Sequence, residues 1–504
     1  MIPRSTKALK KLPLAALAVA CGSAFGAVVN PDLAAAVRRD GVAQAIIVLP
    51  DQSTPMLAPL ASNADYRAHR RALVDALRAR ADAQQAGIRA LLDANGASYR
   101  AFWIANVIVA NVDTRTLQQL AARRDAARIE PNPTIPVALP RPKAGSAKPA
   151  DVESIAWGVS KINAPEVWAA GDTGQGVVIA GEDTGYQWDH PALKSHYRGW
   201  NGSSADHNYN WHDAIHDSVG NPCGNDTQAP CDDYGHGTHT AGTFVGDDGA
   251  THQIGVAPGA KWIGCRNMDD GAGTPERYIE CMQWMLAPTD LSDQNPDPDL
   301  APDVISNSWS CTPGEGCTVG NEIETAVANL TAGGIFFVAA AANDGPNCGT
   351  ITGPPAIYPN VFTIGATNSS DALAGFSSRG PVRSSRILPS GTRVKPEVSA
   401  PGVSVPSAWP PNTYTNLDGT SMATPHVAGA AALLMSANPA LKGHPAVVGR
   451  ILRETAVTVG VTDPVNQTCG GTPRDTWPNN MIGYGRIDVF AAYQVAIDEM
   501  GAIE

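Results

Sequence analysis

The 504-residue sequence predicts an α/β protein with a mainly parallel β-sheet covered by helices on both faces, preceded by a small α+β domain. Three observations predict this architecture. From Asp151 onward, short runs rich in Val, Ile and Ala alternate with helical patterns, as strands and crossover helices do in parallel sheets. The residues before Pro140 mix helical and strand-like patterns in a shorter stretch. Between the two parts lies a polar, Pro-rich segment, PRPKAGSAKPA, at 140–150.

The small domain contains five expected elements. An apolar run predicts a strand, and an Ala-, Arg- and Leu-rich stretch with helical periodicity predicts a long helix that ends at Asn95-Gly96. A β-like, a helical and an extended segment follow. In chain order the five elements lie at residues 43–49, 64–95, 99–112, 114–123 and 127–137.

The large domain alternates strands with helices. Strands are expected at residues 177–180, 261–265, 304–306, 335–339 and 361–366. Helices are expected at residues 275–286, 322–332 and 424–436. Because the carboxyl ends of parallel strands lie at one edge of a sheet, we expect the chemistry at that edge.

The first residues are typical of an export signal. Four Lys and Arg residues precede the apolar run Leu12–Ala20, which ends among small residues and is too short to span a bilayer. We expect a secreted protein, extracellular or periplasmic, with no membrane span; a lipid anchor on Cys21 is the alternative. The expected segments are a signal peptide at 1–27, the α+β domain at 28–139, a linker at 140–150 and the large domain at 151–504.

The charge is divided unevenly along the chain, whose formal net charge is −12. Residues 1–150 hold 20 Lys and Arg against 10 Asp and Glu, which leaves 16 against 38 for the remainder. An acidic body argues against a nucleic-acid partner, because phosphate backbones are bound through Lys and Arg. We expect instead that the basic front part and the acidic body attract each other.

Eight cysteines follow Cys21, at positions 223, 231, 265, 281, 311, 317, 348 and 469. An even number in an exported chain predicts disulfides. Two close pairs, Cys223 with Cys231 and Cys311 with Cys317, each enclose a Gly- and Pro-rich loop that a disulfide would staple. A zinc site is the alternative, and the lack of any CxxC pair argues against it.

Three segments carry the residue types that a nucleophilic hydrolase needs. Asp183 follows an apolar strand in VVIAGEDTG, His236 lies at a helix start in DDYGHGTHTAGT, and Ser421 opens a long helix in LDGTSMATPHVAGAAALL. An alcohol is a weak nucleophile, so it needs an imidazole to take its proton and a carboxylate to fix the imidazole's tautomer. Backbone N–H groups at a helix start and the side chain of Asn343, in FFVAAAANDG, are suited to stabilise an oxyanion.

Each of these residues alone has a structural explanation. An Asp after a strand or an Asn-Asp-Gly sequence is usually a turn, a Ser at a helix start is usually a cap, and a lone His is packed or binds a metal. The four together, in their extended contexts, favour a hydrolase.

These segments resemble a known family. GEDTG, GHGTHTAGT and GTSMATPHVAGAAAL resemble the Asp, His and Ser signatures of the subtilases, the subtilisin-like serine proteases, and AAANDG resembles their oxyanion-hole segment. Other stretches, such as QWDHPALKSHYRGWNG and GYGRIDVFAA, are most similar to the bacillopeptidase F-like branch, and the resemblance spans residues 151–492. The α+β domain is similar to the subtilase propeptide, an intramolecular chaperone and inhibitor whose tail lies in the substrate cleft until it is cut off.

The resemblance implies a subtilisin-like fold and a secreted serine endopeptidase that works through an acyl-enzyme and cuts its own precursor between about residues 137 and 155. Its partners are protein or peptide substrates and its own propeptide. The implied catalytic residues are Asp183 as the orienting carboxylate, His236 as general base and acid, Ser421 as nucleophile and Asn343 as oxyanion donor. The implied substrate-binding residues are Ser308, Trp309 and Ser310, Gly271, Ala272 and Gly273 on the opposite side of the peptide, and Gly353 near the primary specificity pocket.

The chain departs from the family at four positions. Ser310 and Cys311 replace two glycines in the cleft wall, and Ala342 replaces the glycine that often precedes the oxyanion Asn. Ala192 replaces an Asp that ligates a strong calcium ion in many subtilases, so we expect that site to be absent. The chemistry requires no cofactor. Structural calcium at other acidic loops stays open, beside the simpler explanation of a solvated acidic surface.

Three alternative functions were weighed. Sedolisins also carry a GTS-type serine segment but use Glu and Asp in place of His, and Glu182 beside Asp183 leaves this alternative open, although GHGTH disfavours it. An esterase of the α/β-hydrolase type is disfavoured because its GxSxG motif fails at Ala423. A binding protein on an inactive protease scaffold would lack a triad residue, and none is lost. His239 and His426 are expected to make structural hydrogen bonds.

Overall fold

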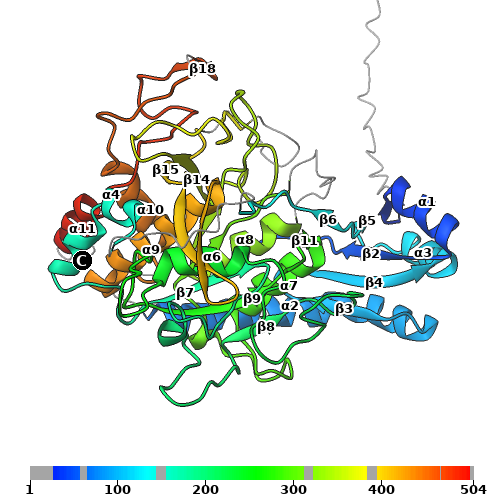
Figure 1. Ribbon diagram of the computed structural model, residues 1–504. Coiled ribbons are helices and arrows are strands. Elements are labelled where there is room, and N and C mark those ends of the chain that lie inside the picture. Colours follow the sequence, from blue (N-terminus) through cyan, green and yellow to red (C-terminus); the bar gives the residue numbers. More distant parts are fainter. Residues whose placement is uncertain are drawn as a thin grey trace, which may run out of the picture.

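The computed structural model describes residues 26–56, 65–142, 155–311, 322–382, 394–465 and 467–499 (Figure 1). The expected signal peptide and Cys21 lie outside these residues, except for the last two residues of the signal, and so does most of the expected linker. Within the described ranges, no helix has the length and apolar character needed to cross a membrane.

The large domain is built on a sheet of seven parallel strands, as the sequence predicts. In spatial order they are β15 (Val398–Pro401), β14 (Phe362–Thr367), β13 (Phe336–Ala340), β12 (Val304–Asn307), β7 (Val178–Asp183), β9 (Lys261–Arg266) and β8 (Trp211–Asp213). The five middle strands are the five expected ones, with small differences at their ends. The two edge strands were missed because β8 (Trp-His-Asp) and β15 (Val-Ser-Ala-Pro) lack two successive β-branched residues, such as the Val304-Ile305 that begins the equally short β12.

Helices cover both faces of this sheet, each over its own apolar core (Figure 1). One face carries α4 (Trp157–Lys161), α5 (Ala164–Ala169), α6 (His236–Val245), α9 (Thr420–Ala437), α10 (Pro445–Glu454) and α11 (Val489–Asp498). The other carries α7 (Pro275–Leu286) and α8 (Glu322–Ala332), both with the predicted bounds. Small side chains allow the buried helix α9 to pack closely: a Cβ added at Gly429 would lie 2.6 Å from the Cβ of Val256.

The small domain is an antiparallel sheet with one parallel edge strand and three helices. Its strands are, in spatial order, β1 (Val28–Val29), β5 (Arg128–Pro131), β2 (Val42–Val48), β4 (Val107–Asp113) and β3 (Tyr99–Phe102). Its helices are α1 (Pro31–Asp40), α2 (Tyr66–Asn95) and α3 (Thr114–Ala121). The sequence did not predict β1 or α1, since β1 has two residues and α1 buries only Leu33 and Val37.

The two domains share a core. Alternation along β2 places Ile47 among the small domain's own helices, whereas Ile46 joins a cluster that includes Met282 of α7 and Leu330 of α8. Ion pairs among the described residues also cross the interface. They join Arg71 to Asp299 at 2.6 Å, Arg100 to Glu276 at 2.7 Å and to Glu280 at 3.7 Å, and Arg128 to Glu322 at 2.6 Å.

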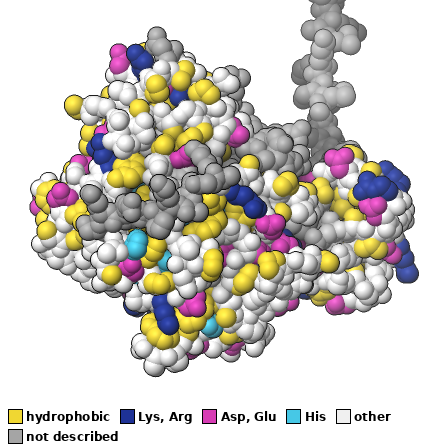
Figure 2. Space-filling view, in the orientation of Figure 1, with side chains coloured by type: hydrophobic (Ala, Val, Ile, Leu, Met, Phe, Trp, Pro, Cys, Tyr) yellow, Lys and Arg dark blue, Asp and Glu magenta, His cyan; other side chains and the backbone are white. Residues whose placement is uncertain are grey.

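These cross-domain ion pairs agree with the expected attraction between the basic front part and the acidic body. Not all of the basic charge lies at the interface. Figure 2 shows basic side chains gathered at the outer end of the small domain, where α1 ends with Arg38 and Arg39.

One strand of the small domain belongs to a sheet of the large one. β6 (Ile135–Pro136) pairs antiparallel with β11 (Ala272–Gly273), which pairs with β10 (Met268–Asp269) (Figure 1). The remaining strands form two hairpins, β16 (Val405–Trp409) with β17 (Thr413–Leu417) and β18 (Thr468–Cys469) with β19 (Thr472–Pro473). The tail of the small domain therefore lies along a segment that the sequence assigned to substrate binding.

Three disulfides join six cysteines in the part of the chain that the structure describes. The predicted pair Cys223–Cys231 is present, and Cys265–Cys281 and Cys348–Cys469 were not predicted. Their separations of 16 and 121 residues give no local signal in the sequence. Cys317 lies outside the described residues, so its expected pairing with Cys311 stays a prediction.

Candidate active site

Asp183 and His236 form a buried pair at the carboxyl end of the sheet. Asp183 is the last residue of β7, and His236 is the first residue of α6. Oδ1 of Asp183 lies 2.7 Å from Nδ1 of His236 and also accepts a hydrogen bond from the backbone N–H of Thr184 at 2.8 Å. Because an ionised carboxylate only accepts hydrogen bonds, this contact places the proton of a neutral imidazole on Nδ1. Nε2 of His236 is buried without a hydrogen-bond partner among the described residues and is left to accept a proton.

Ser421 is the second residue of α9, and two reciprocal hydrogen bonds tie it to Ser308. The Ser421 hydroxyl donates to the carbonyl of Ser308 at 2.8 Å, and the Ser308 hydroxyl donates to the carbonyl of Ser421 at 2.9 Å. In a regular helix the Ser421 carbonyl would accept from the residue four positions on, but Pro425 has no N–H. Ser308 therefore supplies the missing donor and fixes the start of α9 against the end of β12.

Asn343 is oriented by the residue next to Ser421. Its Oδ1 accepts hydrogen bonds from the backbone N–H and the hydroxyl of Thr420, at 2.9 and 3.0 Å. The amide NH₂ of Asn343 is thus the end left to donate. Ala342, directly before it, has φ +77°, a left-handed conformation that a glycine adopts without strain. The alanine that replaces the family's glycine at position 342 therefore has a strained backbone conformation.

A cavity of about 80 Å³ brings Ser421 and Asn343 together with the cleft segment, whereas Asp183 and His236 are not among its lining residues. Its lining includes Ser308, Trp309, Ser310, Asn343, Asp344 and Ser421, together with residues 137–139 of the small domain. Gly271, Ala272 and Gly273 are not among the lining residues. Ala272 and Gly273 pair with β6. Gly353 is not among the lining residues; Pro354, which follows it, accepts a hydrogen bond at 2.9 Å from the backbone N–H of Cys311.

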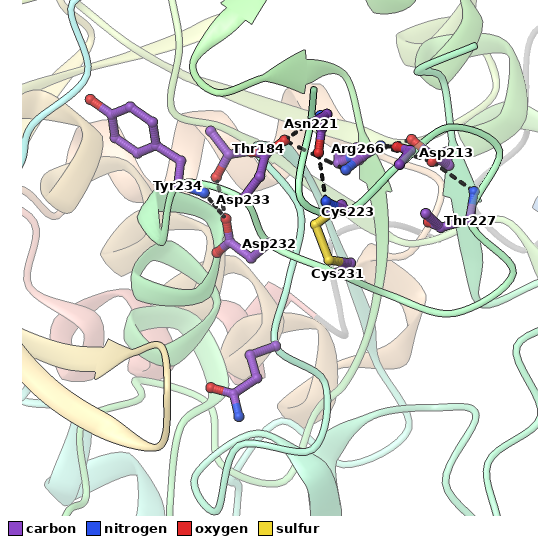
Figure 3. The surroundings of a disulfide bond; sticks show 12 residues. Thr184, Asp213, Asn221, Cys223, Thr227, Cys231, Asp232, Asp233, Tyr234 and Arg266 are labelled. Atoms are coloured by element: carbon purple, nitrogen blue, oxygen red, sulfur yellow. Dashed lines mark hydrogen bonds and ion pairs between the residues drawn. A yellow bond between two sulfur atoms is a disulfide. The ribbon is translucent and has the colours of Figure 1, made fainter. Parts of the chain in front are cut away.

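Asp232, which the sequence analysis counted only among the acidic loops open to calcium, is part of this site (Figure 3). Its Oδ1 accepts from the Thr184 hydroxyl at 2.9 Å and from the backbone N–H of Gly235 at 2.8 Å. Its Oδ2 accepts from the backbone N–H and the hydroxyl of Thr238, at 3.0 and 2.5 Å. One carboxylate therefore connects the residue after Asp183 with the first turn of α6, whose N-cap, Gly235, has no side chain to cap the helix.

The predicted disulfide holds the backbone that presents Asp232. Cys231, bonded to Cys223, precedes Asp232 (Figure 3). The Cys231 carbonyl accepts a hydrogen bond from the Tyr186 N–H at 3.1 Å. The two chains approach so closely that a Cβ added at Gly185 would lie 1.8 Å from the Cys231 oxygen. The signal that could have identified Asp232 is its position between this cysteine and the GHGTH segment.

We expect Asp232→Asn to lower kcat about 10- to 100-fold with little change in KM. The amide NH₂ of Asn cannot accept hydrogen bonds, so at least one donor near His236 loses its partner, at a cost of about 1–3 kcal/mol. Steady-state kinetics on a peptide substrate measure the effect. The control is Asp226→Asn on the same loop, whose side chain is 61% exposed. An unchanged kcat for Asp232→Asn, or an equal loss in both variants, would contradict the role of Asp232 in positioning His236.

The two other histidines of the motifs make the structural hydrogen bonds that were expected. Nε2 of His239 lies 3.1 Å from the carbonyl oxygen of Val405, and Nδ1 of His426 lies 2.8 Å from that of Met422. Burial lowers the pKa of His239 to about 3 and that of His426 to about 4. Both rings are therefore neutral at physiological pH.

Glu182 does not share the position of Asp183. Neighbouring residues of a strand point to opposite faces of the sheet, so Glu182 points away from the face of Asp183 and His236. Neither carboxylate oxygen of Glu182 has a hydrogen-bond partner among the described residues, and burial raises its pKa well above the usual value. This arrangement gives no support to the sedolisin alternative.

The described residues show no cluster of three or more His, Cys, Asp or Glu side chains suited to a metal ion. Ala192, which stands where many subtilases have a calcium ligand, is fully buried. The sequence left open whether acidic loops bind a structural calcium ion. The described residues offer no set of side-chain ligands for such an ion.

Comparisons with known proteins agree with the geometry. Residues 174–485 match the model of the subtilase family. The chain is 35% identical over 465 residues to bacillopeptidase F of Bacillus subtilis, covering 88% of this chain and 30% of that protein. It is 34% identical over 289 residues to subtilisin E of the same species, covering 57% of this chain and 62% of that protein. It is 33% identical over 316 residues to subtilisin Savinase of Lederbergia lenta, covering 62% of this chain and 94% of that protein. The chain thus spans under a third of bacillopeptidase F and under two thirds of subtilisin E.

Proposed function

Because the chain belongs to the subtilase family, we propose that it is a subtilisin-like serine endopeptidase, secreted as a precursor that cuts itself. The observation that carries this proposal is the buried 2.7 Å contact between Asp183 and His236, which leaves Nε2 of the ring as a proton acceptor. The seven-stranded parallel sheet places both residues at the edge where α/β proteins bind their ligands.

In the proposed mechanism the Ser421 hydroxyl first leaves the Ser308 carbonyl and turns toward Nε2 of His236. His236 takes the proton while the serine oxygen attacks the substrate carbonyl, and Asp183 holds the imidazole in the right tautomer and stabilises the imidazolium. The Asn343 NH₂ donates to the oxyanion. Removing such a donor typically costs about 3 kcal/mol of transition-state stabilisation. His236 then protonates the leaving amine, and water hydrolyses the acyl-enzyme. Every step uses groups of this chain, so the chemistry requires no cofactor.

The substrate is proposed to be an extended segment of a protein or peptide that lies between residues 308–310 and β11. The pairing of β6 with β11 supports this binding mode, since backbone hydrogen bonds of this kind accept any sequence. Side-chain preference then depends on the cavity beside Ser421.

Residues 28–139 are proposed to act as the propeptide, an inhibitor that lies in its own enzyme's cleft. The support is the shared core of the two domains and the β6 strand on β11. Secretion is proposed from the leader sequence. The three described disulfides are consistent with an oxidising compartment outside the cytoplasm.

Covalent labelling tests the proposed activity. We expect a serine-directed fluorophosphonate to inactivate the mature enzyme and to modify Ser421, as identified by mass spectrometry of the digested protein. Prior incubation with a peptide aldehyde should protect Ser421, because both compounds require the same hydroxyl. Modification of another serine with loss of activity, or full activity after Ser421 is labelled, would refute the assignment.

A further inference from the structure

The tail of the small domain crosses the cavity that contains Ser421. Up to residue 137 the tail lies on β11 as an added β-strand, the binding mode proposed for the substrate. Ile135 and Pro136 pair with Gly273 and Ala272, and the backbone N–H of Val137 donates to the Gly271 carbonyl at 2.9 Å. Since the backbone is held at successive positions, the register of the tail on the cleft is fixed.

The tail bends sharply at Ala138. The backbone N–H of Leu139 donates to the carbonyl of Val137 at 2.8 Å, which closes a three-residue turn around Ala138. The Leu139 carbonyl in turn accepts from the hydroxyl of Tyr234 at 3.0 Å. Tyr234 lies next to β11, since a Cβ added at Gly271 would lie 3.0 Å from Cε2 of the Tyr234 ring. Residues 137 and 139 are therefore held from the same side of the cleft, residue 137 by Gly271 and residue 139 by the loop leading to His236.

The next residue extends this path toward the catalytic serine. A Cβ added at Gly419 would lie 2.9 Å from Cγ of Pro140. Gly419 is the N-cap residue of α9 and lies two positions before Ser421. The segment between β11 and α9 that crosses the reactive groups is thus Ala138-Leu139, and both residues line the cavity with Ser421 and Asn343.

We propose that the peptide bond between Ala138 and Leu139 is the first bond that the enzyme cuts in its own precursor. This inference rests on the proposed self-processing activity and adds which peptide bond of the precursor is cut first. The alternative is a first cut in the linker at 143–150 or in residues 151–155, which the sequence alone leaves equally open.

The step balances within the chain and one water molecule. The Ser421 oxygen attacks the Ala138 carbonyl carbon, and the hydroxyl proton passes to His236. The bond from that carbon to the Leu139 nitrogen breaks, and His236 gives the proton to this nitrogen, which becomes the new amino terminus. Water then attacks the ester between Ser421 and Ala138. The products are a free carboxylate on Ala138 and the restored hydroxyl.

The same register defines the side chains that the site accepts. Ala138 lines a cavity of about 80 Å³ with Trp309, Ser310 and Asn343, and this space stays empty beside the exposed alanine. Ile135, three positions earlier, is fully buried against Cys311, one of the residues that replaces a glycine in the cleft wall. The inferred substrates are peptides with an apolar residue three positions upstream of the bond, and the empty space leaves room for a side chain larger than alanine directly before it.

The first experiment follows the full-length precursor with time. The precursor is produced by cell-free synthesis, and the fragments are identified by intact mass and N-terminal sequencing. We expect the earliest pair of fragments to end at Ala138 and begin at Leu139, at a rate independent of precursor concentration, since the tail lies in its own cleft. An earliest fragment that begins between residues 143 and 155 would overturn the inference.

Two matched variants test the cavity. Ala138→Asp places a carboxylate beside Asp344, which also lines the cavity, and should slow the first cut at least tenfold. Thr134→Asp adds the same charge at an exposed residue before β6 and should change the rate less than twofold. Equal melting temperatures show that both precursors are folded. A first cut of Ala138→Asp at the wild-type rate would overturn the inference.

The inference and the proposed function fail in different ways. A first cut at another bond that still disappears in Ser421→Ala overturns only the assignment of the bond. A first cut that persists in purified Ser421→Ala overturns self-processing itself. Cleavage at Ala138-Leu139 that requires Ser421 supports both.

Discussion

Ser421→Ala is expected to leave an uncut precursor and to reduce peptidase activity about a millionfold. The substitution removes the attacking oxygen and the ester that it forms. Little else changes in the fold, because the carbonyl of Ser421 still accepts from the Ser308 hydroxyl, at 2.9 Å in the wild-type structure. The loss should therefore be chemical, with a melting temperature close to that of the wild-type precursor.

The measurement combines gel analysis of the expressed protein with hydrolysis of a peptide substrate. Ser370→Ala, on an exposed turn of the same domain, is the control and should mature normally. If Ser421→Ala matures at the wild-type rate without added protease, another enzyme makes the cut. If it also retains activity, the proposed nucleophile is wrong.

The fold was largely predictable because its signals are local. The five middle strands of the large sheet are buried on both faces and therefore appear as continuous apolar runs in the sequence. Elements of two or three residues, such as β1 and β8, have no period to detect. They form because neighbouring strands offer unpaired backbone groups, which is a property of the folded protein.

The candidate catalytic residues were predictable for a different reason. Asp183, His236, Ser421 and Asn343 each lie in an extended motif, and each comes just after a strand or at the start of a helix. The structure places them at those positions. The chemical roles themselves came from the resemblance and stay proposals for this chain.

The supporting contacts were only partly predictable. Four of the five hydrogen-bond donors to Asp232 come from residues 234–238, close to it in the sequence, but the fifth, the Thr184 hydroxyl, reaches it only after folding. The bond between Ser308 and Ser421 joins residues 113 positions apart. Similarly, Cys348 and Cys469 have no sequence relation that would identify them as partners. Such contacts depend on how the elements pack, which local patterns do not encode.

The strain at Ala342 lies where the proposed chemistry needs rigidity. A left-handed conformation costs an alanine about 1–2 kcal/mol, and the surrounding hydrogen bonds must outweigh that cost. The two bonds from Thr420 to Asn343 are part of that support and also link the oxyanion donor to the helix of the nucleophile. Asn343 and Ser421 are thus positioned as one unit.

Asp183→Asn is expected to lower kcat about ten-thousandfold while KM changes little. Oδ1 of Asp183 accepts from Thr184 N–H as well as facing Nδ1 of His236, and Oδ2 lies 3.3 Å from the Thr240 hydroxyl. In the variant, an amide NH₂ that faces the ring forces Nδ1 to accept, which moves the ring proton to Nε2. Nε2 then cannot take the proton of Ser421. Substrate binding by β11 is untouched, so the loss should appear in kcat.

Glu182→Gln is the matched control, one residue earlier on the same strand. Burial raises the pKa of Glu182 well above its usual value and so favours the neutral acid, whose charge and shape glutamine matches. We expect kcat within a few-fold of wild type.

The raised pKa of Glu182 also affects stability. The unfolded chain releases a proton that the folded chain keeps, so Glu182 destabilises the fold increasingly above the unfolded pKa, about 4.3. Glu182→Gln should therefore raise the melting temperature at neutral pH. If instead Glu182→Gln abolished activity and Asp183→Asn did not, the catalytic carboxylate would be on the other face of β7, and the pairing with His236 would be only structural.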